Sequence, residues 1–258
     1  MLPPGADYAS QLRNRKFMTL VIAPAKLTLS LKVTGVRNDG FHHIDAEMVS
    51  LELHDVLTID NGETGMSVSG PFAEGVPTDR NNLIVRALQL AGKSAHVHVE
   101  KNIPHGGGLG GGSSDAAAVL RWAEFDDLVA ASKLGADIPF CIRGGRARVT
   151  GIGEVVEPLP YIARDITLVV PPFGVSTPAV YKAFDALNAS HNGVNDLEAA
   201  AIVVEPQLAQ WRDRIREASG VMPTLAGSGA TWWLEGAHPH IREALGEATV
   251  VVTRTRPA

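Results

Sequence analysis

The chain has 258 residues, a formal net charge of −5, and 45% hydrophobic against 20% charged residues. These values are ordinary for a soluble globular protein and give no basic surface for nucleic-acid binding. The single cysteine, Cys141, excludes an internal disulfide framework, and no apolar run approaches the roughly 18 residues of a membrane span. We therefore expect a cytoplasmic protein with no nucleic-acid or membrane partner.

Residues 1–18 precede the first strand and lack the apolar core of a secretory signal. We expect them to form a tail that is either disordered or an artefact of the assigned translation start site.

Apolar alternation predicts mainly strands in the first part of the chain, with a turn at Asn38-Asp39-Gly40. The expected strands are 19–22, 27–33, 44–53, 56–59 and 96–101. Helices are expected at 82–90, 114–122 and 127–134, and a hairpin at 140–143 and 146–150.

The composition changes around Pro158 and Pro160, where we place a boundary between domains at 19–160 and 161–258. The second domain is predicted to mix strands and helices, which makes the fold class α+β. Its expected strands are 166–170, 224–226, 230–234 and 249–253, and its expected helices are 177–184, 196–204, 206–218 and 239–245.

The most informative segment has six glycines at 106–112 and leads directly into an alanine-rich helix. Glycines let backbone N–H groups approach a ligand, and the free N–H groups at a helix start bind anions. Ser113 or Ser114 can cap this helix or reach a phosphate oxygen or its metal. A flexible linker would not end in a capped helix, so we interpret the segment as a phosphate-binding loop.

Two familiar nucleotide motifs fit less well. A P-loop needs a lysine after the glycines, and none follows here. Gly106, Gly108 and Gly111 match the dinucleotide fingerprint, but the strand predicted before them has one polar face, whereas a Rossmann strand is buried on both faces. The Rossmann interpretation is therefore weak.

Four segments, in this order, resemble the GHMP kinase superfamily: 24–27, the glycine loop with its serines, 134–140 and 227–229. Within it, 34–42 and the Gly-Ala-Asp-Ile-Pro run are most similar to the 4-diphosphocytidyl-2-C-methyl-D-erythritol kinases. The resemblance implies an N-terminal nucleotide-binding domain with a left-handed βαβ unit, a ferredoxin-like C-terminal domain, and substrate between them. The implied reaction moves the γ-phosphate of ATP to the 2-hydroxyl of the cytidyl substrate in non-mevalonate isoprenoid biosynthesis.

The chemistry of an alcohol acceptor suggests two catalytic residues. A tertiary alcohol is a poor nucleophile, so a carboxylate should accept its proton, and Asp137 matches the family position. We expect Pro139 to keep Ile138 extended, which would hold Asp137 on a turn. Lys26 would keep Asp137 ionised and lower the pKa of the alcohol. The structural alternatives are a turn cap for Asp137 and a solvated strand-end position for Lys26.

The resemblance also implies binding residues. ATP would contact Pro104, His105, Gly106, Gly107, Gly108, Leu109, Gly110, Gly111, Gly112, Ser113 and Ser114, with Asn81 and Asn82 near the adenine. Mg²⁺ would bridge the β- and γ-phosphates with Ser113 or Ser114 as its hydroxyl ligand. The substrate would contact Phe41, His42, Tyr181, Thr28, Gly227, Ser228 and Gly229.

Each of these assignments has a structural alternative. Phe41 and Tyr181 would stack on cytosine and His42 would bind its edge, or they are core rings and a turn histidine. The two asparagines are alternatively helix caps, and 227–229 a strand turn.

The chain also departs from the family pattern. Thr28 stands where an asparagine is usual, Phe41 replaces a tyrosine, and the segment 120–133 is short. Two alternatives stay open: another small-alcohol kinase of the superfamily, acting on homoserine or mevalonate, or a catalytically silent nucleotide-binding homologue. We expect a monomer or a weak homodimer.

Overall fold

The computed structural model describes residues 18–187 and 193–258. The tail expected from the sequence therefore lies outside the described residues, except for Met18, which begins the first strand. None of the helices in the described part of the chain combines the length and apolar character needed to cross a membrane.

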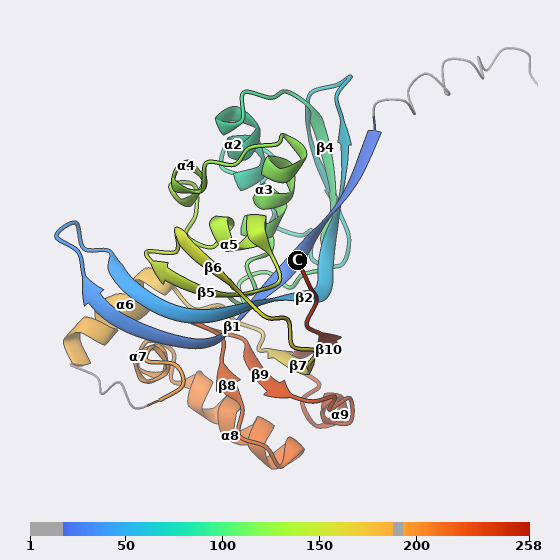
Figure 1. The fold of residues 1–258 in the computed structure, drawn as a ribbon. Coiled ribbons are helices and arrows are strands. Elements are labelled where there is room, and N and C mark those ends of the chain that lie inside the picture. The colour runs from blue at the N-terminus through green and yellow to red at the C-terminus, as the bar shows by residue number, and fades with distance from the viewer. Residues whose placement is uncertain (1–17, 188–192) are drawn as a thin grey trace, which may run out of the picture.

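The N-terminal part is built on a six-stranded sheet with the order β3-β4-β2-β5-β6, in which β1 pairs with β2 (Figure 1). The strands are β1 (Met18–Val36), β2 (His42–Asp60), β3 (Gly65–Ser69), β4 (His96–Glu100), β5 (Arg146–Gly151) and β6 (Val155–Leu159). The separate strands predicted at 19–22 and 27–33 are one strand, as are those predicted at 44–53 and 56–59. Register shifts, such as the one between Pro24 and Lys26, let β1 continue through Pro24, which lies between the two predicted strands.

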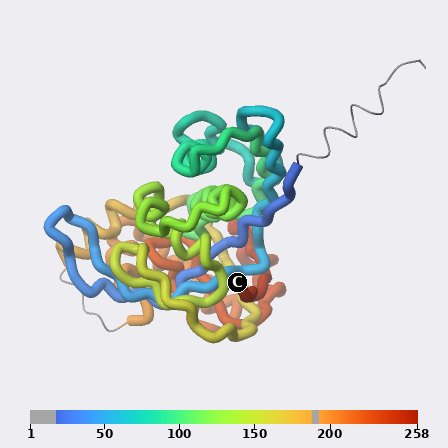
Figure 2. The backbone as a smooth tube through the Cα atoms, turned by 45° about the horizontal axis from the view of Figure 1, so that its top comes forward, coloured from blue at the N-terminus to red at the C-terminus, as the bar shows by residue number. Residues whose placement is uncertain are grey.

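Four helices gather on one side of this sheet, as Figures 1 and 2 both show. They are α2 (Leu83–Leu90), α3 (Gly111–Trp122), α4 (Leu128–Ser132) and α5 (Ile138–Arg143). Strands β3 and β4 are parallel and are joined through α2, which gives the expected βαβ unit. The central α3 buries a run of small and apolar side chains from Ala116 to Leu120, so it serves as the core helix of this part.

Three local predictions are wrong. Residues 140–143 are not a strand but belong to α5, in which Pro139 lies in the first turn and Ile138 is helical rather than extended. A proline is tolerated there because the first N–H groups of a helix need no intrahelical partner. The hairpin is instead made by β5 and β6. Helix α3 begins at Gly111, with Gly110 as its N-cap, so neither predicted serine caps it.

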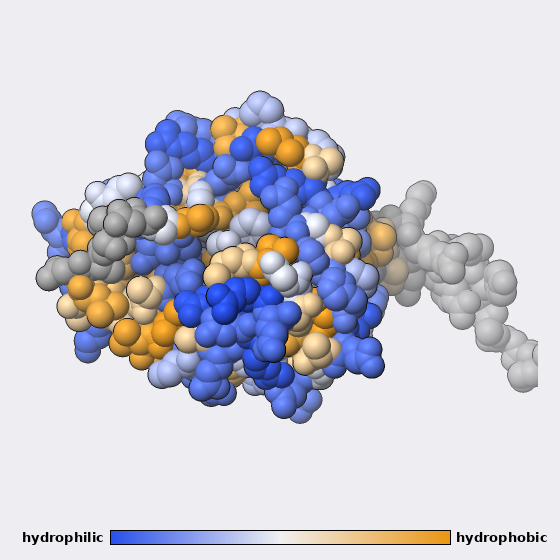
Figure 3. Space-filling view, turned by 90° about the horizontal axis from the view of Figure 1, so that it is seen from below, coloured by the Kyte–Doolittle hydropathy of each residue, from blue (hydrophilic) through white to orange (hydrophobic). Residues whose placement is uncertain are grey.

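The C-terminal part is a four-stranded antiparallel sheet with the order β10-β7-β9-β8. Its elements are β7 (Asp165–Val170), α6 (Thr177–Leu187), α7 (Glu198–Val204), α8 (Gln207–Ser219), β8 (Thr224–Leu225), β9 (Trp232–Glu235), α9 (Ile241–Ala244) and β10 (Thr249–Arg254). With three helices in the first crossover, this is the ferredoxin-like order implied by the resemblance. The face that carries α8 is mostly hydrophilic, with scattered apolar residues (Figure 3).

The two sheets meet along the long β1–β2 hairpin. Isolated bridges join Leu31 to Asn195 and Leu51 to Thr255, so the end of the chain lies beside β2, as both ribbon views show. The sheets divide the chain between Leu159 and Asp165. The domain boundaries placed near residue 160 stay a prediction.

The glycine loop packs against β1 and the 227–229 loop through its backbone. The backbone N–H of Lys26 donates to the carbonyl of Leu109 at 3.0 Å. A Cβ on Gly108 would lie 2.8 Å from the carbonyl oxygen of Gly229, and one on Gly110, where φ is +69°, would lie 2.7 Å from Cγ of Lys26. Glycine is therefore required at both positions by packing within the chain as well as by any ligand.

A buried ion-pair network lies next to the glycine loop, between the segment that precedes the loop and the helix that follows it. The Lys101 ammonium pairs with Asp55 and, at 2.5 Å, with Asp115 of α3. Asp55 also accepts the backbone N–H of Ile103 at 2.8 Å, just before the loop. Asp115 Oδ1 is buried without a hydrogen-bond partner among the described residues. Burial raises the pKa of Asp115 to about 7, with Asp55 acting in the same direction and Lys101 in the opposite one.

This network predicts a pH-dependent stability difference between the wild type and Asp115→Asn. The pKa of Asp115 rises from its ordinary 3.8 to about 7 on folding. As the pH rises through this interval, the unfolded chain releases a proton that the folded chain keeps, so this group's contribution to stability is lost. Urea unfolding of both proteins should show the free energy of unfolding of the wild type, minus that of the variant, falling from pH 4 to pH 7. A constant or rising difference would contradict the assignment.

Candidate active site

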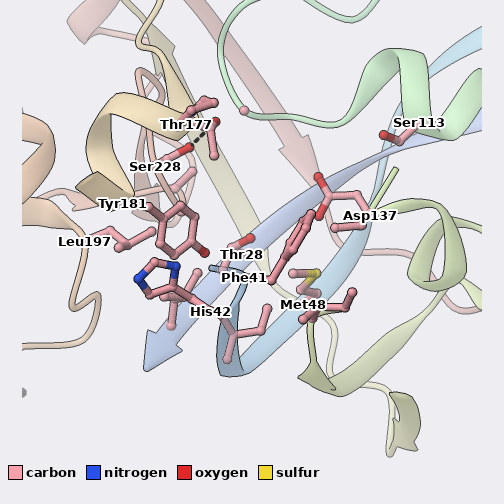
Figure 4. A pocket seen from close by; sticks show the side chains of 18 of the residues that line it. Thr28, Phe41, His42, Met48, Ser113, Asp137, Thr177, Tyr181, Leu197 and Ser228 are labelled. Carbon is pink, nitrogen blue, oxygen red and sulfur yellow. Dashed lines mark hydrogen bonds between the residues drawn. The ribbon is translucent and has the colours of Figure 1, made fainter. Parts of the chain in front are cut away.

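One cavity of about 670 Å³ collects residues from both parts of the chain. Its walls come from the β1–β2 hairpin, the glycine loop, the start of α5, the start of α6 and the 227–229 loop (Figure 4). Ten residues predicted from the sequence line it: Lys26, Thr28, Phe41, His42, Gly108, Ser113, Asp137, Tyr181, Gly227 and Ser228. Residues from positions 26 to 228 therefore converge on a single volume.

Lys26 and Asp137 form an ion pair inside this cavity, with Nζ and Oδ2 3.2 Å apart. The Lys26 side chain is only 8% exposed, which excludes the alternative of a solvated strand-end lysine. Asp137 occupies the N-cap position of α5, but its side chain makes no capping hydrogen bond. The turn-cap alternative is therefore wrong as well, and the carboxylate, 32% exposed, is available to a ligand.

Thr28 lies beside this pair and faces the cavity. Its hydroxyl is 3.4 Å from the Lys26 ammonium, which can donate to it. The threonine therefore supplies a hydrogen-bond acceptor to the lysine at the position where the family usually has an asparagine.

The structure separates the two serines of the glycine loop. Ser114 is buried, and its hydroxyl donates to the carbonyl of Pro24 at 2.6 Å, which fastens α3 to β1. Ser113 lines the cavity on the side of Asp137. Of the two predicted metal ligands, Ser113 lines the cavity, whereas the Ser114 hydroxyl is turned to the backbone of β1.

The other end of the cavity is aromatic. The ring of His42 packs on Tyr181 with centroids 4.7 Å apart, and its Nε2 is 2.7 Å from Asp185 Oδ1. Phe41 is 59% exposed, so it is a surface ring at the cavity rather than part of the core. Burial raises the pKa of Tyr181 to about 12, and the charge of Asp137 adds to the shift, so its phenol stays protonated at neutral pH.

Several predicted binding residues lie outside the cavity. Asn82 caps α2 by accepting the N–H of Ile84 at 2.8 Å, and Asn81 bonds to Asp79, so the structure gives both asparagines local roles. Leu109 is buried in the core. The rest of the predicted ATP- and substrate-binding residues do not line the cavity either: Pro104, His105, Gly106, Gly107, Gly110, Gly111, Gly112 and Gly229.

The sequence analysis missed lining residues that contact the predicted ones. Asp185 lies one helical turn after Tyr181 on α6, and this four-residue spacing was the available signal. Thr177, at the start of the same helix, has its hydroxyl 2.8 Å from that of Ser228, which joins α6 to the 227–229 loop (Figure 4). The apolar lining residues Leu31, Met48 and Leu197 carried no signal of their own.

Comparison with known proteins agrees with this geometry. Residues 82–145 match the family described as GHMP kinases N terminal domain. A 4-diphosphocytidyl-2-C-methyl-D-erythritol kinase of Paracoccus denitrificans is 42% identical over 229 residues, covering 81% of this chain and 84% of the relative. One from Cereibacter sphaeroides (strain ATCC 17025 / ATH 2.4.3) is 35% identical, with coverages of 83% and 88%.

Solved structures give the same result. A crystal structure of a 4-(cytidine 5'-diphospho)-2C-methyl-D-erythritol kinase has a TM-score of 0.72 and 32% identity, covering 92% of this chain and all of that one. The mevalonate kinase of Methanococcus jannaschii, with a TM-score of 0.56 and 12% identity, shares the fold alone, covering 94% of this chain and 99% of its own. On these similarities, the chain belongs to the 4-diphosphocytidyl-2-C-methyl-D-erythritol kinase family of the GHMP kinases.

Proposed function

We propose that this chain transfers the γ-phosphate of ATP to the 2-hydroxyl of 4-diphosphocytidyl-2-C-methyl-D-erythritol. The observation that carries the proposal is the Lys26–Asp137 pair, which lies in one cavity between the glycine loop and the aromatic end. Membership of the GHMP kinases supports ATP as the donor. The cytoplasmic location and the monomeric or weakly dimeric state stay predictions from the sequence.

Asp137 would act as the general base. Its carboxylate accepts the proton of the acceptor hydroxyl while the hydroxyl oxygen attacks the γ-phosphorus, and the bond from the γ-phosphorus to the bridging oxygen breaks to release ADP. Lys26, with Nζ 3.2 Å from Asp137 Oδ2, would stabilise the negative charge that develops in the transition state. Both groups are held by rigid elements, β1 and the start of α5.

The glycine loop would hold the triphosphate. Gly108 and Ser113 line the cavity, and the unpaired N–H groups at the start of a helix such as α3 favour binding of an anion. No cluster of three or more His, Cys, Asp or Glu side chains in the described residues is placed to hold a metal. This fits Mg²⁺, which takes most of its ligands from phosphates and water, with the Ser113 hydroxyl as a protein ligand. When bound, Mg²⁺ would offset the charge on the β- and γ-phosphates.

The aromatic end would bind the cytosine. An ionised carboxylate only accepts hydrogen bonds, so His42 Nε2 must donate to Asp185, and a neutral ring then presents Nδ1 as an acceptor. The exocyclic amine of cytosine is a matching donor. The exposed ring of Phe41 supplies a stacking surface that does not need the missing tyrosine hydroxyl.

Asp137→Asn should lower kcat by about 10²- to 10⁴-fold, the usual contribution of a positioned general base, while ATP affinity changes by no more than a few fold. The readout is ADP release in a coupled assay with the cytidyl substrate, homoserine and mevalonate as acceptors. Asp39→Asn is the matched control, because Asp39 also lines the cavity but pairs with Arg37.

Three results would count against the proposal. Turnover of homoserine or mevalonate without the cytidyl substrate would make the chain a different small-alcohol kinase. ATP binding by the wild type without any transfer would make it a silent homologue. An equal loss in Asp39→Asn would show that Asp137 has no special role.

Asp185→Ala should raise the KM for the cytidyl substrate about 10- to 150-fold, since a charge-assisted hydrogen bond contributes roughly 1.5–3 kcal/mol, and leave kcat and the KM for ATP nearly unchanged. Asp185→Asn, whose carbonyl can still accept from His42 Nε2, should retain most of the affinity. A rise in the KM for ATP of the same size would place Asp185 at the nucleotide instead.

A further inference from the structure

A second cavity, of about 260 Å³, shares no lining residue with the catalytic one. It lies where β1, the ends of α3 and α5, and the last residues of the chain meet, close to the label C in Figure 1. Its lining residues are Val21, Ile22, Pro24, Ser50, Arg121, Cys141, Ile142, Arg143, Gly144, Arg256, Pro257 and Ala258. The catalytic site and the proposed reaction make no use of it.

The charged side chains of this lining all carry the same sign. The lining contains three arginines, Arg121, Arg143 and Arg256, and no aspartate or glutamate side chain. None of the three forms an ion pair with a carboxylate anywhere in residues 18–187 and 193–258. Arginines on nearby strands do form ion pairs with carboxylates: Arg146 pairs with Glu47 at 2.7 Å, and Arg254 pairs with Asp165 at 2.8 Å.

Arg121 is held rigidly within this group. Its Nη1 donates to the carbonyl of Cys141, and its Nη2 donates to the carbonyl of Ile22 at 2.9 Å. Burial lowers the pKa of Arg121, and the positive charge of Arg256 acts in the same direction. The cavity therefore brings guanidinium groups together, and no aspartate or glutamate side chain is among its lining residues.

One further polar residue lines the cavity. Ser50 is buried, its backbone N–H donates to the carbonyl of Gly145, and its carbonyl accepts the backbone N–H of Arg256. Unpaired positive charge next to apolar surface is costly unless an anion neutralises it. The planar, multiply donating guanidinium matches phosphate oxygens, and the volume is smaller than that of typical pockets for nucleotide-sized ligands.

We propose that Arg121, Arg143 and Arg256 form a binding site for a small phosphoryl anion, phosphate or diphosphate in size, separate from the ATP site. Arg121 contacts one carbonyl of β1 and one of α5, so the site is joined to the two elements that position the catalytic-cavity pair. Strand β1 carries Lys26, and Asp137 immediately precedes α5. The proposal does not depend on the acceptor substrate of the kinase.

The test is thermal unfolding of the full chain in saturating ADP, titrated with inorganic phosphate or diphosphate at constant ionic strength. ADP occupies the glycine loop, so a further rise in Tm that saturates with phosphate reports a separate site. The double variant Arg143→Gln/Arg256→Gln should bind phosphate at least tenfold more weakly. Arg216→Gln, an exposed arginine on α8, is the matched control and should bind as the wild type does.

The rise in Tm caused by ADP alone should be the same in all variants, which would show that each variant is folded and binds ADP. A loss of phosphate binding in the arginine variants can then be distinguished from a failure of the kinase assignment. If the double variant does not fold, Arg143→Gln alone, at an exposed position, should weaken phosphate binding at least threefold. The proposal is overturned if phosphate gives no rise beyond that of chloride, or if the arginine variants keep the full effect. It is equally overturned if malonate, a dicarboxylate, stabilises as strongly as phosphate.

Discussion

The catalytic cavity depends on the close backbone packing of the glycine loop against β1 and the 227–229 loop. The hydrogen bond from the Lys26 N–H to the Leu109 carbonyl places the loop beside the strand that carries the lysine. A side chain at Gly108 would collide with the Gly229 carbonyl and push the C-terminal loop away. Since Gly227 and Ser228 line the same cavity, the absence of a Cβ at position 108 is what lets the two sheets contribute to one site.

Two lysine–carboxylate groups near this loop have different environments. Lys26 and Asp137 face the cavity, and Asp137 keeps access to a ligand. Lys101, Asp55 and Asp115 lie beneath the loop, nearly closed to solvent. Groups in water-excluded surroundings interact strongly, but burial also opposes the ionised form of Asp115. The buried network therefore anchors the start of α3, whereas the accessible pair is suited to proton transfer.

Much of the fold followed from local patterns. The helix at 83–90 and the strands of the C-terminal sheet agree with the elements expected from periodicity and turn residues, and the ferredoxin-like order agrees with what the family resemblance implied. The short strands β3 and β6 and the helix α5 did not. Segments of five or six residues carry too few periods to distinguish a strand from a helix, so their partners decide their structure.

The sequence by itself predicted a glycine loop that leads into a helix, and it singled out Lys26, Asp137 and Phe41 as candidate site residues, because glycine spacing and motif residues depend on local chemistry. Only the tertiary structure decided that Ser113 rather than Ser114 lines the cavity, that Asp185 hydrogen-bonds to His42, and that three arginines share a pocket without an aspartate or glutamate side chain. The reason is physical: which side chains face a common volume depends on how strands and helices more than 100 residues apart pack together, and no local pattern encodes that packing.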